Sequence, residues 1–174
     1  MKFRRSASAV LCIMALCLTS ACSKKIDGSS MDKFYASAGE MQKAVSSDRQ
    51  DEFSNGLDMI LFYAVDPYDE VSQLNGKTAD GVFEAIQQVR DSKPRLDGSR
   101  KERYNTSLAE VLKSIPNDEA RQSLVNQMQR YGFSPWNSKN ETNIRSIDGK
   151  NAFEISKTIS EIRKNEDPTK MNEK

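Results

Sequence analysis

The chain has 174 residues, which suits a single domain, and its 26 basic side chains nearly balance its 25 acidic ones. This balance excludes the basic surface on which nucleic-acid-binding proteins depend. The chain has no histidine, which excludes serine–histidine and cysteine–histidine catalysis and the HExxH zinc site. We therefore predict a protein that is not an enzyme, has no catalytic residues, binds no cofactor or metal and has no nucleic acid partner.

The first 21 residues have the layout of an export signal. The chain begins MKFRR, with three basic side chains, and residues 7–18 form an uncharged, mostly apolar run of 12 residues. Spanning a bilayer takes roughly 20 residues, so this run is too short for a permanent membrane helix. Small residues precede Cys22, and the stretch resembles the lipobox of bacterial lipoproteins, with Thr19 where leucine is usual. The resemblance implies cleavage before Cys22 and acylation of Cys22.

Acylation of Cys22 defines an expected partner and location. Two or three acyl chains hold a protein stably on a membrane, so the membrane is the predicted partner through this N-terminal lipid anchor. We expect a protein of the cell envelope, with residues 22–25 as the tether. In a bacterium with two membranes, Ser23 after the cysteine implies the outer membrane, facing the periplasm. Removal of residues 1–21 leaves 23 basic and 25 acidic side chains, a net charge of −2.

Beyond the tether, apolar residues recur at helical spacing, and no long run alternates with a period of two. An apolar residue followed by Asx-Gly occurs four times and predicts a turn before a helix. These turns lie at residues 26–29, 74–77, 96–99 and 147–150. The residues predicted to cap the helices that follow are Ser30, Thr78, Ser99 and Asn151.

The four predicted helices carry the same buried stripe. Apolar residues lie 8, 12 and 15 positions after each initial apolar residue, which places them on one helical face. The order of the signals divides the helical domain, residues 26–163, into halves at 26–92 and 96–163. We predict an all-α fold, a compact bundle of about six helices made of two tandem three-helix halves from an internal duplication, with residues 164–174 as a disordered tail.

The first half also carries a series of motifs. IDGSS lies at residues 26–30, F-x-x-S-x-x-x-M runs from Phe34 to Met41, and NGKTAD-x-V runs from Asn75 to Val82. Together they resemble a family of small bacterial lipoproteins of unknown function, from residue 26 to about residue 89. The resemblance implies an envelope location and an α-helical fold, and it brings no activity with it.

Three groups of residues have the types found in active sites, and each has a simpler interpretation. Ser30 and Lys33 have the S-x-x-K spacing of serine acyl-transfer enzymes, but Ser30 is placed to cap a helix. The acids of residues 66–70 suit a hard cation, or merely a solvated turn. Glu40 and Glu110 suit an acid–base pair, but nothing in the sequence places them in a cleft.

A proline with aromatic neighbours connects the helices in the middle of each half. In the first half this connector contains Tyr68, and in the second it contains Phe133, Pro135 and Trp136. Aromatic side chains are enriched at the centres of protein interfaces, so Tyr68, Phe133 and Trp136 are the predicted binding residues. The other interpretation is that these rings pack against the core.

The function predicted from these features is that of a non-enzymatic interaction or accessory protein at the membrane surface, with an envelope protein as its partner. The alternative is a helical module that binds a small hydrophobic or peptidoglycan-derived ligand, which requires a pocket. A carboxylate-based hydrolase requires two acids facing each other across a cleft.

Overall fold

The computed structural model describes residues 24–134, 136 and 139–166. The regular structure in these ranges is entirely helical, which confirms the all-α prediction. The helices are α1 (Met31–Ala44), η1 (Ser47–Arg49), α2 (Gln50–Phe62), α3 (Pro67–Leu74), α4 (Ala79–Ser92), α5 (Lys101–Lys113), α6 (Asp118–Arg130), α7 (Glu141–Ser146) and α8 (Ala152–Glu166). The predicted signal, Cys22 and residues 167–174 lie outside the described residues.

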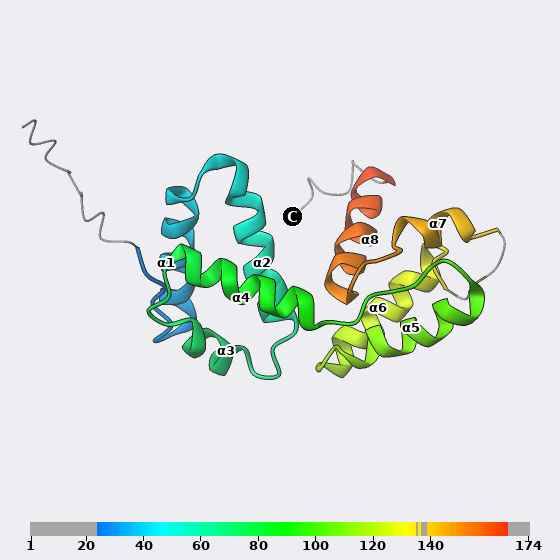
Figure 1. The fold of residues 1–174 in the computed structure, drawn as a ribbon, viewed down its shortest axis with the longest axis horizontal. Helices are drawn as coiled ribbons and strands as arrows, with labels where there is room; N and C mark the ends of the chain where they lie inside the picture. Colours follow the sequence, from blue (N-terminus) through cyan, green and yellow to red (C-terminus); the bar gives the residue numbers. More distant parts are fainter. Residues whose placement is uncertain (1–23, 135, 137–138, 167–174) are drawn as a thin grey trace, which may run out of the picture.

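The described residues form eight α-helices rather than about six, because each half contains one additional short helix. Helix α3 has 8 residues and α7 has 6, which is too short for an amphipathic period to be recognised in the sequence. Helix α8 continues to Glu166, so the first residues of the predicted tail are helical. Figure 1 shows two lobes, α1–α4 and α5–α8, which we call the first and second lobes.

Each lobe is closed by the same pair of backbone hydrogen bonds, which we call the clamp. Ile26 exchanges two bonds with residues 76–77, at 2.8 and 2.9 Å, and thereby joins the start of the lobe to the turn before its last helix. Leu96 exchanges the same two bonds with residues 149–150, again at 2.8 and 2.9 Å. The clamp therefore repeats at equivalent positions, as an internal duplication requires.

Side chains reinforce both clamps in the same way. The N–H of Gly28 donates to Asn75 Oδ1 at 2.9 Å, and the N–H of Gly98 donates to Asp148 Oδ1 at 2.6 Å. The turn before each last helix is completed by a glycine with positive φ, 76° at Gly76 and 72° at Gly149 in the second lobe. The four Asx-Gly turns of the sequence thus pair to form two clamps, residues 26–29 with 74–77 and residues 96–99 with 147–150.

The predicted helix caps are correct except at the start of α5. Ser30 and Thr78 each accept a hydrogen bond from a backbone N–H three residues later. Asn151 and Glu154 bond each other's backbone N–H groups, at 3.0 and 3.1 Å, in a capping box. Ser99 does not cap α5: its N–H and hydroxyl both donate to the Asp97 carboxylate, and the N-cap is the following arginine.

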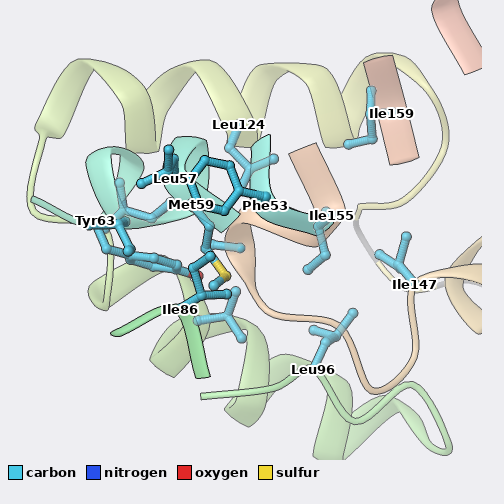
Figure 2. Close-up of a cluster of buried hydrophobic side chains, with 14 of the residues drawn as sticks. Phe53, Leu57, Met59, Tyr63, Ile86, Leu96, Leu124, Ile147, Ile155 and Ile159 are labelled. Atoms are coloured by element: carbon cyan, nitrogen blue, oxygen red, sulfur yellow. The ribbon is translucent and has the colours of Figure 1, made fainter. Parts of the chain in front are cut away.

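Most residues of the predicted stripes lie in the core, which is one apolar cluster that includes residues of both lobes, while Val89, Leu108 and Ile162 are only partly buried against it. Figure 2 shows Phe53, Met59 and Ile86 of the first lobe together with Leu96 and Ile155 of the second. The fully buried stripe residues are Phe34, Met41, Val82, Ile86, Tyr104, Val111, Ile155 and Ile159. Among the described helices, none combines the length and the hydropathy needed to cross a membrane.

Candidate functional site

Of the predicted site residues, Phe133 lies in the core and not on a surface. Its side chain has no exposed area, and the Tyr104 hydroxyl donates to its carbonyl oxygen. The cause is the end of α6, where Gly132 has a φ of 74° and the Phe133 N–H donates to the Met128 carbonyl at 2.7 Å. This is a Schellman ending, in which the residue after the glycine turns back onto the helix. The ring of Phe133 is therefore out of reach of a partner.

Trp136 lies against the same buried tyrosine. Its ring centroid is 5.5 Å from that of Tyr104, and the indole is partly buried against the core. Pro135, the proline of this connector, lies outside the described residues. The position of Trp136 agrees with the packing interpretation of the second connector.

Tyr68 has the opposite character, since 69% of its surface is exposed. It lies in the first turn of α3, in the first lobe, whereas Phe133 and Trp136 belong to the second lobe. The structure therefore does not bring the three predicted binding residues together at one site.

Ser30 and Glu40, two of the residues with active-site spacing, are engaged in structural contacts. Ser30 accepts the Lys33 N–H at 3.3 Å, which is a helix cap. The Glu40 carboxylate bonds Lys43 at 2.9 Å and Lys24 at 3.0 Å, and these two hydrogen bonds lower the pKa of Glu40 to about 2. Glu40 is on α1 and Glu110 on α5, so they occupy equivalent helices of different lobes. The described residues contain no group of three or more metal-ligating side chains.

Exposed apolar residues of large size are confined to the first lobe in the described part of the chain. They are Tyr35 (56% exposed), Val65 (89%) and Tyr68 (69%). Val65 and Tyr68 lie on the turn from α2 into α3. The carboxylate of Asp66 accepts the N–H of Tyr68 at 2.8 Å, and Pro67 begins the helix, so this turn is fixed in shape.

Four carboxylates lie in or near this turn in the sequence. Asp58 precedes the end of α2, Asp66 caps α3, and Asp69 and Glu70 lie in the first turn of α3. None of the four forms an ion pair with another described residue. We call this surface the acidic corner and define it by Asp58, Val65, Asp66, Tyr68, Asp69 and Glu70.

A groove between α1 and α2 ends beside the acidic corner. It has a volume of about 160 Å³, and its walls include Phe34, Ala38 and Leu57. Tyr35 from α1 and Asp58 from α2 also line it, so the exposed ring of Tyr35 lies near the end of α2 from which the corner turn leaves.

Comparison of equivalent positions in the two lobes shows which residues of the first lobe the fold itself requires. The clamps align Tyr35 with Asn105 and Tyr68 with Glu141, so polar residues occupy these positions in the second lobe. Residues 50–76 contain six acids and no base, whereas the equivalent residues 121–149 contain two acids and four bases. This contrast in charge is visible in the sequence and was the signal by which the acidic corner could have been found.

In a comparison with known proteins, no protein family, curated protein or solved structure matches the chain. The resemblance of residues 26–89 to a family of small lipoproteins therefore stays a prediction.

Proposed function

We propose that the protein is a lipid-anchored, non-enzymatic protein of the cell envelope that binds another envelope protein through its acidic corner. The observation that carries this proposal is the difference between the lobes. Both keep the same clamp, yet in the described part of the chain only the first lobe exposes large apolar side chains, among them Val65 and Tyr68. Because Glu141 serves the fold at the position equivalent to Tyr68, an exposed ring there is not a requirement of folding. Exposed aromatic rings offer large contact areas with few rotatable bonds, as protein interfaces favour.

The charge of the corner indicates the chemistry of its partner. Asp66, Asp69 and Glu70 are neighbours of Tyr68 in the sequence, and none of them pairs with a basic residue in the ranges that the structure describes. Such a surface is complementary to a protein surface with basic residues around an apolar pocket. The same carboxylates are repelled by an anionic lipid surface. The proposed partner is therefore a protein and not the lipid surface.

The start of the described chain supports a membrane-proximal first lobe. Lys24 donates to both the carboxylate and the backbone carbonyl of Glu40 on α1. Only one residue separates Lys24 from Cys22, and two residues span at most about 7 Å. If Cys22 is acylated, the surface of α1 around Glu40 lies next to the bilayer, and the second lobe lies at the far end of the molecule from α1 (Figure 1).

Site-specific crosslinking in intact cells tests the proposal. A photoreactive p-benzoylphenylalanine in place of Tyr68 should give an adduct with one envelope protein, whose binding is then measured with the purified partner. The same amino acid in place of Glu141 is the matched control, because it occupies the equivalent place in the other lobe. We expect no adduct from position 141.

Charge neutralisation makes the test specific. Asp69→Asn combined with Glu70→Gln should weaken the adduct from position 68 and the binding of the purified partner, and raised salt should do the same. An absence of adducts at position 68, equal adducts at positions 68 and 141, or an adduct indifferent to both charge and salt would each reject the proposed surface.

A further inference from the structure

A second feature lies between the lobes rather than on one of them. Helices α2 and α8 face each other across the middle of the molecule (Figure 1), and a cleft of about 270 Å³ lies between them. Both lobes contribute to its walls. The lining residues are Glu52, Asn55, Gly56 and Met59 from α2, Arg90 from α4, and Phe153, Glu154 and Lys157 from α8.

Phe153 and Met59, the two large apolar residues of the cleft wall, also make contacts between the lobes. The N–H of Phe153 donates to the Tyr63 hydroxyl at 3.3 Å, and the Phe153 ring lies 5.7 Å from that of Phe62. The buried amide of Asn151 points to the Met59 sulfur at 3.9 Å. Phe153 and Met59 thus provide an apolar surface that a ligand in the cleft would contact.

The two acids of the cleft are already bound by basic or N–H groups. Glu52 accepts from Arg49, the last residue of η1, at 3.4 Å. Glu154 is bonded by Arg95 at 3.4 Å and by the N–H of Asn151 at 3.0 Å, which holds it as part of a helix cap. The negative charge of the cleft is therefore compensated by groups that do not line it.

The two cations of the cleft are less completely paired. Arg90 reaches Glu52 only at 3.7 Å and shares that carboxylate with Arg49. Lys157 forms no ion pair with another described residue, and its side chain is exposed to the cleft opening. The lining therefore holds two acids and two bases, and Lys157 is the base of the wall that no described carboxylate neutralises.

The internal repeat shows that this unpaired lysine is particular to the cleft. Aligned through the clamps, Lys157 of α8 corresponds to Glu84 of α4, so an acid is accepted at this helix position in the other lobe. Arg90 of α4 corresponds to Arg163 of α8, which does not line the cleft. The helices therefore do not require a lysine at position 157.

We propose that the cleft between the lobes binds a small carboxylate with an apolar body, its carboxylate held by Lys157 and Arg90 and its apolar part by Phe153 and Met59. Charge-assisted hydrogen bonds from two cations fix the acid end. The volume of about 270 Å³ is at the lower limit of ligand pockets and fits a body of dipeptide size. A short peptide with a free C-terminus and a short-chain fatty acid both have this chemistry. The site is separate from the acidic corner and does not depend on it.

Methionine-methyl NMR of the full chain in neutral detergent tests this inference. The Met59 methyl reports the floor of the cleft, and those of Met41 and Met128 report the cores of the two lobes. The probes are an N-acetylated Ala-Phe dipeptide, its C-terminal amide, and hexanoate. We expect a saturable shift of Met59 alone, with the free acid binding about tenfold more tightly than the amide. A shift with the dipeptide but not with hexanoate identifies the peptide class, and the reverse identifies the fatty acid class.

Two matched variants complete the test. Lys157→Gln should weaken binding of the acid about tenfold and leave the amide unaffected. Arg163→Gln, at the position equivalent to Arg90 in the other lobe, should change neither the binding of the acid nor that of the amide. The inference is overturned if Met59 does not respond to either acid at concentrations well above a millimolar, if acid and amide bind equally, or if Lys157→Gln binds as the native chain does.

Discussion

Ser37 and Ser107 make the same two hydrogen bonds in the two lobes. Ser37 Oγ accepts the N–H of Asp27 at 2.9 Å, and Ser107 Oγ accepts the N–H of Asp97 at 2.8 Å. Each hydroxyl then donates to the carbonyl three residues earlier in its own helix, at 3.0 and 3.2 Å. Each serine therefore ties the extended segment that enters its lobe to the first helix of that lobe.

Replacing these serines should cost stability in proportion to their burial. Ser107→Ala leaves the N–H of Asp97 without its partner at a nearly dry site, and we expect a loss of about 1–3 kcal/mol in the free energy of unfolding. Ser37→Ala should lie at the lower end of that range, because water reaches this half-buried position more easily. Urea unfolding measures both, with the exposed Ser72→Ala as control. A Ser107→Ala variant within ±0.5 kcal/mol of the native chain would contradict the role of this bond.

The close approach of α3 to the first clamp predicts opposite effects of two glycine substitutions. A Cβ on Gly28 would lie 2.2 Å from the backbone oxygen of Val71, so Gly28→Ala should destabilise the fold by at least about 2 kcal/mol. A Cβ on Gly39, within α1, would meet nothing within 4 Å, so Gly39→Ala should stabilise it by roughly 0.5–1 kcal/mol. Thermal and urea unfolding measure whether each substitution raises or lowers the stability. A Gly28→Ala variant as stable as the native chain would mean that α3 does not pack here.

Burial of the Tyr104 hydroxyl predicts a loss of stability in alkali. Burial raises the pKa of Tyr104 to about 12, from an ordinary 10.0. The unfolded chain therefore releases this proton at a lower pH than the folded chain does. The stabilising effect is complete below about pH 10 and is lost as the pH rises toward 12. We expect the free energy of unfolding to fall between pH 9 and pH 11.5, and to fall less steeply in Tyr104→Phe. If the free energy of unfolding falls equally steeply with pH in the native chain and in Tyr104→Phe, the Tyr104 hydroxyl is not the cause of the loss.

The fold could be predicted to the extent that its signals are local. The helical period and the Asx-Gly turns are properties of short stretches, and they located the stripes of both lobes, such as Phe34 with Tyr104 and Val82 with Ile155. Helices α3 and α7 were missed because their packing against the clamps, rather than a long amphipathic face, holds them in place. The meeting of α2 with α8 depends on contacts distant in sequence, which no local pattern reports.

The candidate site was predicted less well, for a physical reason that Phe133 illustrates. The aromatic character of the connector predicts Phe133 as a binding residue, but an apolar residue after a helix-ending glycine packs back onto the helix. The signal for this was Gly132-Phe133 itself. Exposure of Tyr68 follows instead from its position in the first turn of α3, on the outer side of a capped turn. Burial of an aromatic ring thus depends on which way the turn directs the chain, and the composition of the connector alone does not determine it.

Acylation at Cys22 remains a prediction from the first residues of the chain, and one variant tests it. Cys22→Ser should leave the chain unacylated and uncleaved at this site, because the residue that receives the lipid is gone. Mass spectrometry of the purified protein measures both, and fractionation of cells measures attachment to the envelope. Ser23→Ala is the control and should be processed as the native chain is. An unmodified Cys22 in the native protein, or cleavage at another bond, would remove the lipid anchor from the proposed function.

The three aromatic residues first predicted to bind a partner should respond differently to truncation. Phe133→Ala empties a fully buried site and should cost about 3–5 kcal/mol, whereas Tyr68→Ala should stay within about ±0.5 kcal/mol because its ring already lies in water. Trp136→Ala should lie between them, at roughly 1–3 kcal/mol, since the indole is only partly buried against Tyr104. Urea unfolding followed by circular dichroism compares all three, as it does not depend on the single tryptophan. A Tyr68→Ala variant that loses several kcal/mol would place this ring in the fold, and the acidic corner would lose its exposed aromatic contact. The decisive combination is a stable Tyr68→Ala protein that no longer binds its partner, because only a ring that contacts the partner and not the core produces both results.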